Sequence, residues 1–441
     1  MTKQQQKFTF TFLAFVCLCV AIRAVLWFYC DPMTTLDTPS YISVAKRFVS
    51  GDFKLGYLAC RTPVYPLIIL ICRMNHAHIF LVQMFIGVLT SMLLFSLAWQ
   101  QTKSLPISFL VGISYSLNLR LLFFEAYILT ETFSTFTIVL FVWLILKSIK
   151  TNTSVATSIM CGISVALAAL TRPLLLFLIP LAFIIFVVRQ YNYGTKEGLA
   201  KWSPVMLFLV TACIPVFMWS AFNQAQIGYF GPTALTGYNL TQHSGGFIEK
   251  APGRYEIITK VYIKHRENII KESGTHIHTI WHAWPEMIKE TGMSFAELSR
   301  ELTRMSAGLF IRHPVLYAKS VSCAWWRFWQ EDTFWDLTKV EPQFAARISL
   351  VWKWERIGMI GVSILFMSLS LGMCVVAIKK MIFPLSPIVF SALVILLASI
   401  LQAMVEYGDN SRYAIPFQPL VLFVVITGGW ELVQNMLKYR K

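Results

Sequence analysis

The sequence predicts an all-α polytopic membrane protein: a bundle of about ten transmembrane helices with amphipathic helices in its extracytoplasmic loops. Two properties of the composition predict this class, since 56% of the 441 residues are hydrophobic and only 14% are charged, unlike an ordinary soluble protein. The third observation is the spacing of the charges. Several uncharged apolar stretches approach or exceed the roughly 20 residues that a spanning helix needs.

The formal net charge is +16, a value that nucleic-acid-binding proteins also reach. No module of basic residues interleaved with aromatic ones is visible, and an excess of lysine and arginine in cytoplasmic loops explains the charge better. A basic loop close to anionic lipid headgroups would add to it. Membrane lipid is therefore an expected partner, and nucleic acid is not.

The first span is predicted at residues 8–29. This run is too long for the core of a signal peptide and lacks a cleavage site of small residues, so it is expected to be retained. The second span is predicted at residues 77–99. Residues 30–76 therefore form a first loop between two membrane helices.

Two longer apolar segments, residues 105–147 and 154–188, exceed one crossing at a rise of about 1.5 Å per residue, so each is predicted to be a hairpin. Their turns are expected at Asn118–Glu125 and Thr171–Pro173. The remaining spans are predicted at residues 204–222, 357–378, 381–405 and 414–432.

The long region between the seventh and eighth spans, residues 223–356, carries charges throughout and cannot be one span. Two helices are predicted in it, one over Arg254–Glu272 and one that begins at Ser294 with a capping-box pattern. The second continues as an apolar stripe at helical spacing, formed by Leu298, Leu302, Met305 and Leu309. Both helices are expected to lie on the membrane surface. An aromatic cluster suited to the membrane interface follows, namely Trp325, Trp326, Phe328, Trp329 and Trp335.

The distribution of basic residues predicts the orientation. The segments expected inside hold 13 lysines and arginines: Lys3, Lys7, Lys103, Lys147, Lys150, Arg189, Lys196, Lys201, Lys379, Lys380, Lys438, Arg440 and Lys441. The three short outer turns hold only Arg120, Arg172 and Arg412. Both termini are therefore expected in the cytoplasm, with residues 30–76 and 223–356 outside the plasma (inner) membrane. No repeat or low-complexity linker is present, so residues 1–441 form one membrane domain.

The first loop carries the most distinctive group of polar residues. Asp37 is followed by Tyr41 and Ala45 at helical spacing, and the loop closes with the segment R-T-P-V-Y-P, which contains Arg61 and Tyr65. A carboxylate at the mouth of a membrane bundle is a candidate active-site group. The alternative is that Asp37 caps the helix that begins with T-P directly after it.

This order, D-x-x-x-Y-x-x-x-A, a short amphipathic helix and then R-x-P-x-Y-P, resembles the first outer loop of the GT-C superfamily of polyprenyl-phosphate-sugar glycosyltransferases. The resemblance is to the branch of protein mannosyltransferases and lipid A aminoarabinose transferases. It extends to the R-P turn at Arg172, the H-P turn at His313 and the R-Y-x-x-P start of a late span at Arg412 and Tyr413. In that family the first-loop aspartate lies beside the acceptor and the sugar phosphate and acts as the base. Many relatives have an acidic pair there, whereas this chain has Asp37 followed by a threonine.

The family also carries an acidic residue in its second outer loop, for which Glu125 and Glu131 are the candidates. A carboxylate within a span costs about 2.5–3.5 kcal/mol, so its presence indicates a role that faces a cavity. The resemblance implies that Glu131 is catalytic and that Glu125 contacts substrate. The alternative is a plain ion pair with Arg120 or Arg23.

The resemblance implies substrate contacts for eight residues: Tyr41, Arg61, Tyr65, Glu125, Arg172, His313, Arg412 and Tyr413. A lipid phosphate needs a cation that never deprotonates and donates in a fork, which suits Arg172 and Arg412. The alternative for these arginines is snorkelling to headgroups. The alternative for His313 is a histidine that breaks a helix and bonds to the backbone.

Metal binding is not predicted. His276, His278 and His282 match no standard site and have no carboxylate nearby in the sequence, and no cofactor is required, although a divalent cation is left open. Cys30 and Cys60 share one loop and could form a disulfide if that loop faces an oxidising compartment.

The function implied is transfer of a hexose or pentose from a polyprenyl-phosphate donor to an extracytoplasmic acceptor: a lipid-linked glycan, lipid A, a cell-wall polymer or a protein. Displacement with Asp37 as base would invert the anomeric configuration. The alternatives are a transporter or flippase of a lipid-linked glycan, which would show mid-membrane charges, broken helices and internal repeats, and a non-catalytic scaffold.

Overall fold

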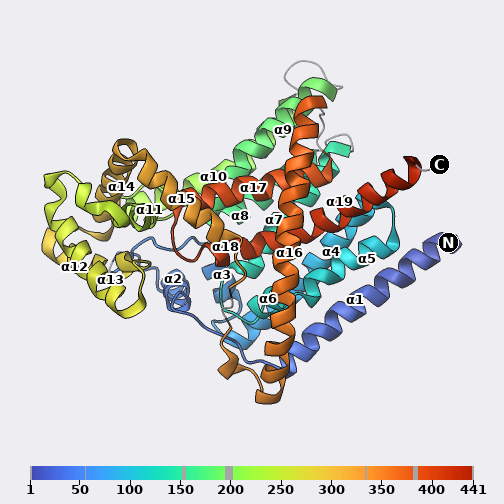
Figure 1. Cartoon of the computed structure of the whole chain (residues 1–441), viewed down its shortest axis with the longest axis horizontal. Helices are drawn as coiled ribbons and strands as arrows, with labels where there is room; N and C mark the ends of the chain where they lie inside the picture. The colour runs from blue at the N-terminus through green and yellow to red at the C-terminus, as the bar shows by residue number, and fades with distance from the viewer. Residues whose placement is uncertain are drawn as a thin grey trace.

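The computed structural model describes residues 2–54, 56–150, 155–193, 202–332, 335–380 and 386–439. These residues form a bundle of long helices and a smaller lobe at one end of it, which we call the outer lobe (Figure 1). The bundle contains α1 (Lys3–Tyr29), α4 (His76–Thr102), α5 (Leu105–Leu117), α6 (Leu119–Phe124), α7 (Glu131–Lys150), α8 (Val155–Ala169), α9 (Leu178–Tyr193), α10 (Ser203–Ile227), α16 (Pro342–Lys380), α17 (Pro387–Val405) and α19 (Gln418–Tyr439). Within the described ranges the extended backbone pairs only as isolated bridges.

Eight helical segments of the described chain are long and apolar enough to cross a membrane. They are α1, α4, α7, α9 with the 3-10 turn η1 (Pro173–Phe177) before it, α10, α16, α17, and α19 with the short α18 (Asn410–Ala414) before it. The two other predicted spans are present as the shorter apolar helices α5 and α8. An all-α polytopic membrane protein is therefore confirmed. The predicted start of the ninth span, at residues 381–385, lies outside the described residues.

Local signals explain where the bundle helices begin. The Asn75 side chain caps α4 by accepting from the backbone N–H groups of Ala77 and His78 at 2.9 and 3.2 Å. Asn118 ends α5 and caps α6, because its side chain accepts from Leu121 N at 3.0 Å. This double role produces the turn that was expected at Asn118–Glu125.

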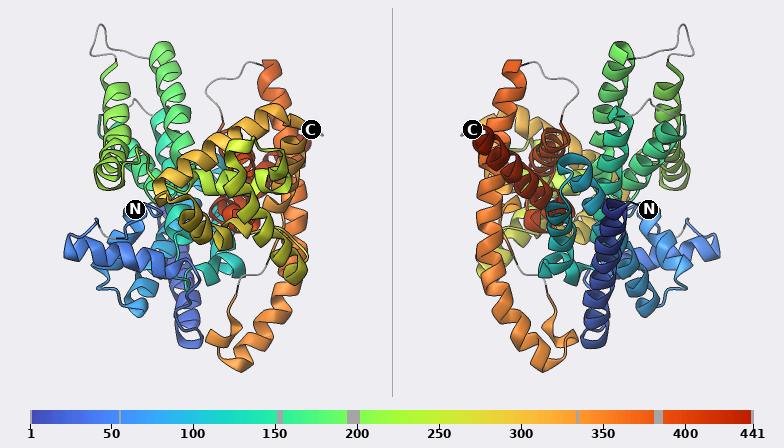
Figure 2. Two further views of the ribbon diagram at one scale, coloured as in Figure 1. Left: turned by 90° about the vertical axis from the view of Figure 1, so that its left-hand side faces the viewer. Right: turned by 90° about the vertical axis from the view of Figure 1, so that its right-hand side faces the viewer.

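The outer lobe consists of α11 (Thr236–Ser244), α12 (Glu256–Ser273), α13 (Thr279–Thr291) and α14 (Phe295–Arg312), with 3-10 turns η3 (Gly245–Lys250) and η4 (Gly253–Tyr255). Figure 2 shows these helices grouped together in front of the bundle, and Figure 1 shows both chain ends at the opposite side of the molecule. The capping box at Ser294 is confirmed, and α12 matches the helix predicted over Arg254–Glu272 closely. Helices α11 and α13 were not predicted.

The apolar stripe of α14 faces the core of the outer lobe. Leu298, Leu302, Met305 and Leu309 are each at most 1% exposed. The stripe packs against α11, whose Tyr238 stacks on Phe295 with ring centroids 4.3 Å apart. The prediction that α14 lies on the membrane surface is therefore wrong, because protein rather than lipid covers its apolar face.

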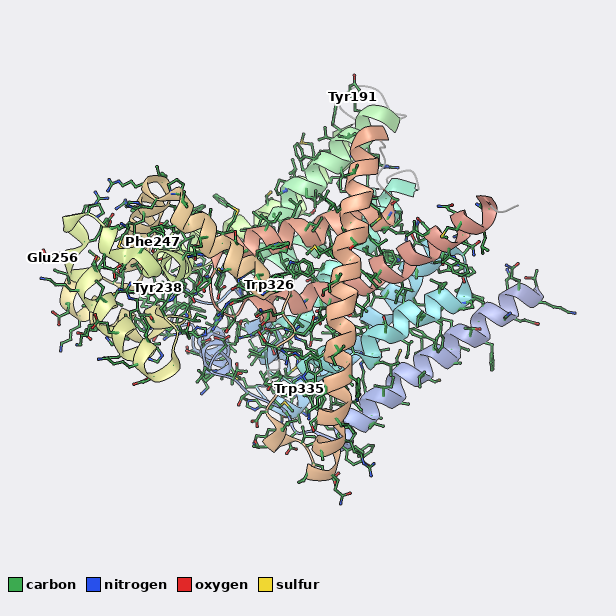
Figure 3. All side chains as sticks on the ribbon, viewed as in Figure 1. Tyr191, Tyr238, Phe247, Glu256, Trp326 and Trp335 are labelled. Carbon is green, nitrogen blue, oxygen red and sulfur yellow. The ribbon has the colours of Figure 1, made fainter. Side chains whose placement is uncertain are left out.

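The aromatic segment after α14 is also more buried than expected. It begins in α15 (Pro314–Phe328) and continues toward α16. Trp329 stacks on Phe366 at 5.5 Å and Trp335 stacks on Phe123 at 4.7 Å, both against the bundle core. Trp326 remains exposed (Figure 3). The predicted interfacial cluster is wrong for Trp329 and Trp335.

The first loop folds back onto the bundle through α2 (Thr38–Ser50) and α3 (Val64–Ile71). Met33 exchanges backbone hydrogen bonds with the turn before α7: its N–H donates to Ala126 O at 2.8 Å, and its carbonyl accepts from Ile128 N at 2.9 Å. Cys30 and Cys60 are both free thiols, so the suggested disulfide is not formed. This loop brings the start of α2 beside the start of α7, where the candidate site lies.

Candidate active site

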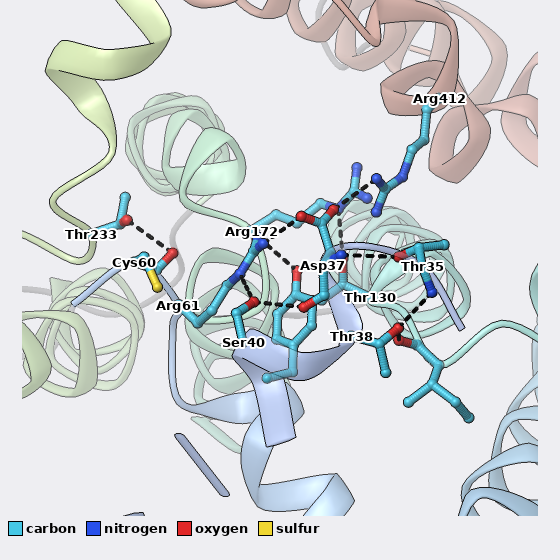
Figure 4. A network of polar contacts seen from close by, with 12 residues as sticks. Thr35, Asp37, Thr38, Ser40, Cys60, Arg61, Thr130, Arg172, Thr233 and Arg412 are labelled. Carbon is cyan, nitrogen blue, oxygen red and sulfur yellow. Dashed lines mark hydrogen bonds and ion pairs between the residues drawn. The ribbon is translucent and has the colours of Figure 1, made fainter. Parts of the chain in front are cut away.

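Asp37 lies immediately before α2, with its carboxylate between two arginines (Figure 4). Its Oδ1 is 2.5 Å from Arg61 Nη2, and its Oδ2 is 2.8 Å from Arg412 Nη1. The carboxylate makes no hydrogen bond to the backbone of α2, so the capping alternative does not describe it. Asp37 links the first loop to the start of the last span.

Arg61 is fixed by the first turn of α2 as well as by Asp37. Its Nε donates to Ser40 Oγ at 2.7 Å, and its guanidinium carbon lies 4.4 Å from the centre of the Tyr41 ring. Stacking on an aromatic face and donating from the edge are both typical uses of the planar guanidinium group. Because Asp37, Ser40 and Tyr41 lie on or just before the first turn of α2, all three contact the same arginine, Arg61.

Glu131 begins α7 and is fully buried. Its Oε1 accepts from Arg412 Nε at 2.5 Å and from Arg172 Nη2 at 2.7 Å. Arg172 also donates from Nε to Thr130 Oγ1 at 3.0 Å, and it precedes η1 in the turn of the second hairpin. Arg412 therefore bridges Asp37 and Glu131, while Arg172 holds Glu131 from the other side.

The cluster carries one excess positive charge, because three guanidinium groups (Arg61, Arg172 and Arg412) face two carboxylates (Asp37 and Glu131). Arg172 and Arg412 are each 12% exposed, so solvent screens this charge only partly. An anion with several oxygens, such as a phosphate, fits this arrangement.

The ion pairs control the acidity of Asp37. Burial of its carboxyl would raise the pKa, but the Arg61 and Arg412 guanidinium groups outweigh burial and lower the pKa to about 2. Burial would likewise lower the pKa of Arg61, but Tyr41 and Asp37 beside it raise that pKa above its ordinary value. Both groups are therefore charged at neutral pH.

The cluster opens into a cavity of about 370 Å³ between the bundle and the outer lobe. One end is cationic and is lined by Asp37, Arg61, Arg172 and Arg412. Beside it η1 contributes an apolar wall, which includes Leu174 and Leu176. The remaining polar lining comes from the outer lobe and the end of α17, namely Thr233, Thr236, Asn239, Gln402 and Glu406. The cavity thus combines a charged end, an apolar wall and a polar wall.

The structure brings together seven of the sequence-predicted site residues: Asp37, Tyr41, Arg61, Glu131, Arg172, Arg412 and Tyr413. Tyr41 and Tyr413 line the cavity, and the ring of Tyr413 lies under the Arg172 guanidinium at 5.1 Å. Glu131 lies behind Arg412, where its Oε2 has no hydrogen-bond partner in the described part of the chain. These residues come from four separate segments of the sequence.

Three predicted residues lie away from the cavity. Glu125 forms a two-pronged ion pair with Arg23 at 2.7 and 2.8 Å, which is the alternative given for it above. Tyr65 is buried behind Tyr41 and donates to Gln83 Oε1 at 2.9 Å. His313 lies at the break between α14 and α15, so none of the three lines the cavity.

Sequence reasoning missed the residues that α11 and the end of α17 contribute. Glu406 is the clearest case, because it directly follows an apolar span and could have been identified by the argument applied to Glu131. Asn239 and Thr236 gave no signal, since α11 itself was not predicted. Their position became visible only when the outer lobe packed against the bundle.

Of the three histidines considered for a metal, His278 and His276 have different partners. His278 Nε2 is 3.3 Å from Asp409 Oδ1, and the ring of His276 stacks on Tyr407 at 5.4 Å. Among the described residues no group of three or more histidine, cysteine, aspartate or glutamate side chains is arranged to hold a metal ion. His276 and His278 instead attach the outer lobe to the segment that carries Glu406 and Arg412.

Comparisons with known proteins yield similarity in structure alone. No protein-family model and no curated protein sequence matches this chain. Two solved structures are similar to it, ArnT from Cupriavidus metallidurans bound to undecaprenyl phosphate and the same protein in the apo state, with 13% and 14% sequence identity and a TM-score of 0.39 in each case. Each alignment covers 94% of this chain, and 77% and 78% of the ArnT chains respectively.

Proposed function

We propose that this protein is a membrane glycosyltransferase that moves a hexose or pentose from a polyprenyl-phosphate donor to an extracytoplasmic acceptor. The observation that carries the proposal is the placement of Asp37 between Arg61 and Arg412 at the mouth of a membrane bundle. A carboxylate and an excess of guanidinium groups in one cavity supply a base and a phosphate site together. Asp37 and Arg61 of the first-loop motif, Arg172 of the R-P turn and Arg412 of the R-Y-x-x-P motif all line this same cavity.

In this proposal Arg172 and Arg412 bind the donor phosphate. Both present guanidinium groups to the cavity, and both are held in place by Glu131. The adjacent apolar wall, with Leu174 and Leu176, suits the first units of a prenyl chain that enters from the membrane. Charge and hydrophobicity together would select a lipid-linked phosphate over a soluble one.

The chemical step is a single displacement. The acceptor hydroxyl oxygen forms a bond to the anomeric carbon, and the bond from that carbon to the phosphate oxygen breaks with its electron pair. The proton of the hydroxyl goes to the Asp37 carboxylate, and polyprenyl phosphate leaves. Arg172 and Arg412 stabilise the charge that grows on the leaving phosphate. Attack opposite the leaving group inverts the anomeric configuration.

Asp37 is a weak base while both arginines hold it, since its pKa is about 2. A donor phosphate on Arg412 would draw that guanidinium away from Asp37 and so raise the pKa of the carboxyl. The base would then become active only when the donor is bound. In this proposal donor binding therefore precedes deprotonation of the acceptor hydroxyl.

The proposed site faces outside the plasma (inner) membrane. The excess of lysine and arginine in the short loops opposite the outer lobe supports this orientation, and both chain ends lie on the side away from that lobe (Figure 1). Labelling of whole cells with a membrane-impermeant thiol reagent tests the orientation. A single cysteine in place of Lys271 should react without lysis, and reaction only after lysis would reverse the assignment.

A transfer assay with purified protein and a panel of radiolabelled polyprenyl-phosphate sugars tests the function. Asp37→Asn should reduce the transfer rate by about 10²–10⁴-fold, the usual loss for a general base, while donor binding persists. A transporter or flippase would move lipid-linked glycan without forming a new glycosidic bond. Near wild-type transfer by Asp37→Asn would contradict the proposed role of Asp37.

A further inference from the structure

The cavity has a second carboxyl, Glu406, which the mechanism above does not use. Glu406 lies at the end of α17 and is 7% exposed, yet it lines the same cavity as Asp37 and Arg412. Its Oε2 accepts from Gln402 Nε2 at 3.2 Å, and the Tyr413 hydroxyl is also within reach of its carboxyl. A buried carboxyl at a cavity wall, held by neutral partners, requires an explanation.

The wall formed by α11 has the same neutral character. Thr236 and Asn239 are three residues apart on one face of α11, and both line the cavity. Asn239 is half-buried where it lines this wall. Because Gln402 and Glu406 also line the cavity, two helices present uncharged hydrogen-bonding groups to one space.

We propose that Glu406, Gln402, Asn239 and Thr236 form a binding subsite for a sugar ring, next to the phosphate-binding arginines. This inference rests on the proposed function and deepens it. Sugar hydroxyls donate and accept hydrogen bonds at once, and every one of these side chains can do both when the carboxyl is protonated. The arginines at the other end of the cavity offer donors only.

Glu406 is expected to exchange its proton close to neutral pH. Burial raises the pKa of its carboxyl to about 7, and the neighbouring Asp409 acts in the same direction against Tyr413, Gln402 and Arg412. Two basic side chains lie near this corner: His278, whose pKa is raised by its hydrogen bond to Asp409, and Arg327, whose guanidinium carbon is 5.4 Å from the centre of the Tyr407 ring. The subsite would therefore weaken in alkaline solution, when Glu406 loses its proton beside Asp409.

The sugar could be the one carried by the donor or one in the acceptor, and binding measurements separate the two. The probes are undecaprenyl phosphate without a sugar and the undecaprenyl-phosphate sugar that the wild-type protein uses. If the subsite holds the donor sugar, Glu406→Ala should weaken binding of the sugar-bearing probe about tenfold and leave undecaprenyl phosphate unaffected. If it holds an acceptor sugar, both probes should bind normally and the KM for acceptor should rise about tenfold.

Glu406→Gln is the matched control, because an amide resembles a protonated carboxyl but cannot ionise. It should keep wild-type affinity at pH 6 and lack the decline in kcat/KM that is expected of the wild type above about pH 7. Asn239→Ala should show the same selective loss as Glu406→Ala and serves if the latter does not fold. Unchanged affinity for both probes and for acceptor in both alanine variants would overturn the subsite, as would equal damage from Gln and Ala at position 406.

The failure of this inference is distinguishable from the failure of the proposed function. A wild-type protein that forms no glycosidic bond with any donor in the panel would contradict the proposed function. A wild-type protein that transfers sugar, together with alanine variants that bind and turn over normally, would contradict the subsite alone. Undecaprenyl phosphate binding serves in every arm as the check that the variant is folded.

Discussion

The protein has two buried arginine sites, the Arg23–Glu125 pair and the cluster around Arg412, and their charges are balanced differently. Arg23 faces Glu125 alone, with two ion-pair contacts of 2.7 and 2.8 Å, and its remaining Nη1 donates to Ser116 Oγ and Cys19 O. Arg412 instead shares Asp37 and Glu131 with two further arginines beside an open cavity. The charges of Arg23 and Glu125 balance each other, whereas the second cluster has three arginines for two carboxylates and so carries one excess positive charge.

The difference shows what separates a structural pair from a binding site when the residue types are the same. Glu125 and Glu131 are both fully buried carboxylates paired with arginine. Glu125 does not line the site cavity and pairs with one cation, so it contributes to the packing of α1 against the turn before α7. Glu131 holds two arginines whose other N–H groups are directed at a ligand-sized space.

Breaking the Arg23–Glu125 pair should have the largest effect on stability. Glu125→Ala leaves Arg23 buried without its partner, which should reduce the free energy of unfolding by about 3–5 kcal/mol. Denaturant titration in detergent measures this loss. Glu301→Ala is the control, because its partner Arg304 is exposed and the pair should contribute only about 0–1 kcal/mol. Equal small effects would show that the Arg23 pair is not a structural element.

Substitutions in the cluster around Arg412 should reduce ligand affinity more than the free energy of unfolding. Arg412→Lys keeps the charge but loses the fork that joins Asp37 and Glu131. Donor affinity should fall about 10–100-fold, as expected for one or two charge-assisted hydrogen bonds. Titration with undecaprenyl phosphate in detergent measures it, with Arg304→Lys on the exposed surface as the control. Unchanged donor affinity would remove Arg412 from the phosphate site.

The space around the Arg23–Glu125 pair offers a smaller test. A side chain on Gly87 of α4 would collide with Glu125 Oε1 and Arg23 Nη2, so Gly87→Ala should destabilise the protein by about 1–3 kcal/mol. Gly429→Ala in α19 is the matched control, because nothing lies within 4 Å of the added carbon. It should leave stability unchanged or raise it by about 0.4–1 kcal/mol. A neutral Gly87→Ala would show that the pair can move aside without loss.

The pH dependence of stability should give the smallest effect. The pKa of Asp37 is lowered to about 2 in the folded protein, so its ion pairs stabilise the fold above the unfolded pKa of about 3.9. That contribution is lost as the pH falls through about 2. The difference in Tm between wild type and Asp37→Asn should therefore be constant at pH 5–7 and shrink below about pH 4. A constant difference down to pH 2.5 would contradict the assignment of these ion pairs.

The helices were predictable where the signal is local. Uncharged apolar runs mark the spans, and the Ser294 capping box marks the start of α14, because both depend on residues within a few positions. What covers an apolar stripe is not a local property. The stripe of α14 fits lipid and protein equally, and its actual cover, α11, is a short polar helix with no periodic pattern of its own.

The residue types of the site were predictable, but their pairing was not. The alternative given for Glu131 was an ion pair with Arg120 or Arg23, but it pairs with Arg172 and Arg412, the latter 281 positions away in the sequence. Arg120 instead binds Glu331 at 2.5 Å. Which arginine meets which carboxylate depends on how the spans are arranged around one another, and that arrangement is set by side-chain packing over the whole bundle.

The Asp37 carboxylate occupies part of the Arg412 guanidinium, so it competes with any anionic ligand for the N–H groups of that arginine. Any anion that enters must displace a carboxylate that is already in place, and it regains little if charge is all that it offers. Inorganic phosphate and other small metabolites would meet this barrier without compensation. In the proposed function a lipid-linked phosphate would also bury its chain against Leu174 and Leu176, so the internal ion pair would favour ligands that have both properties.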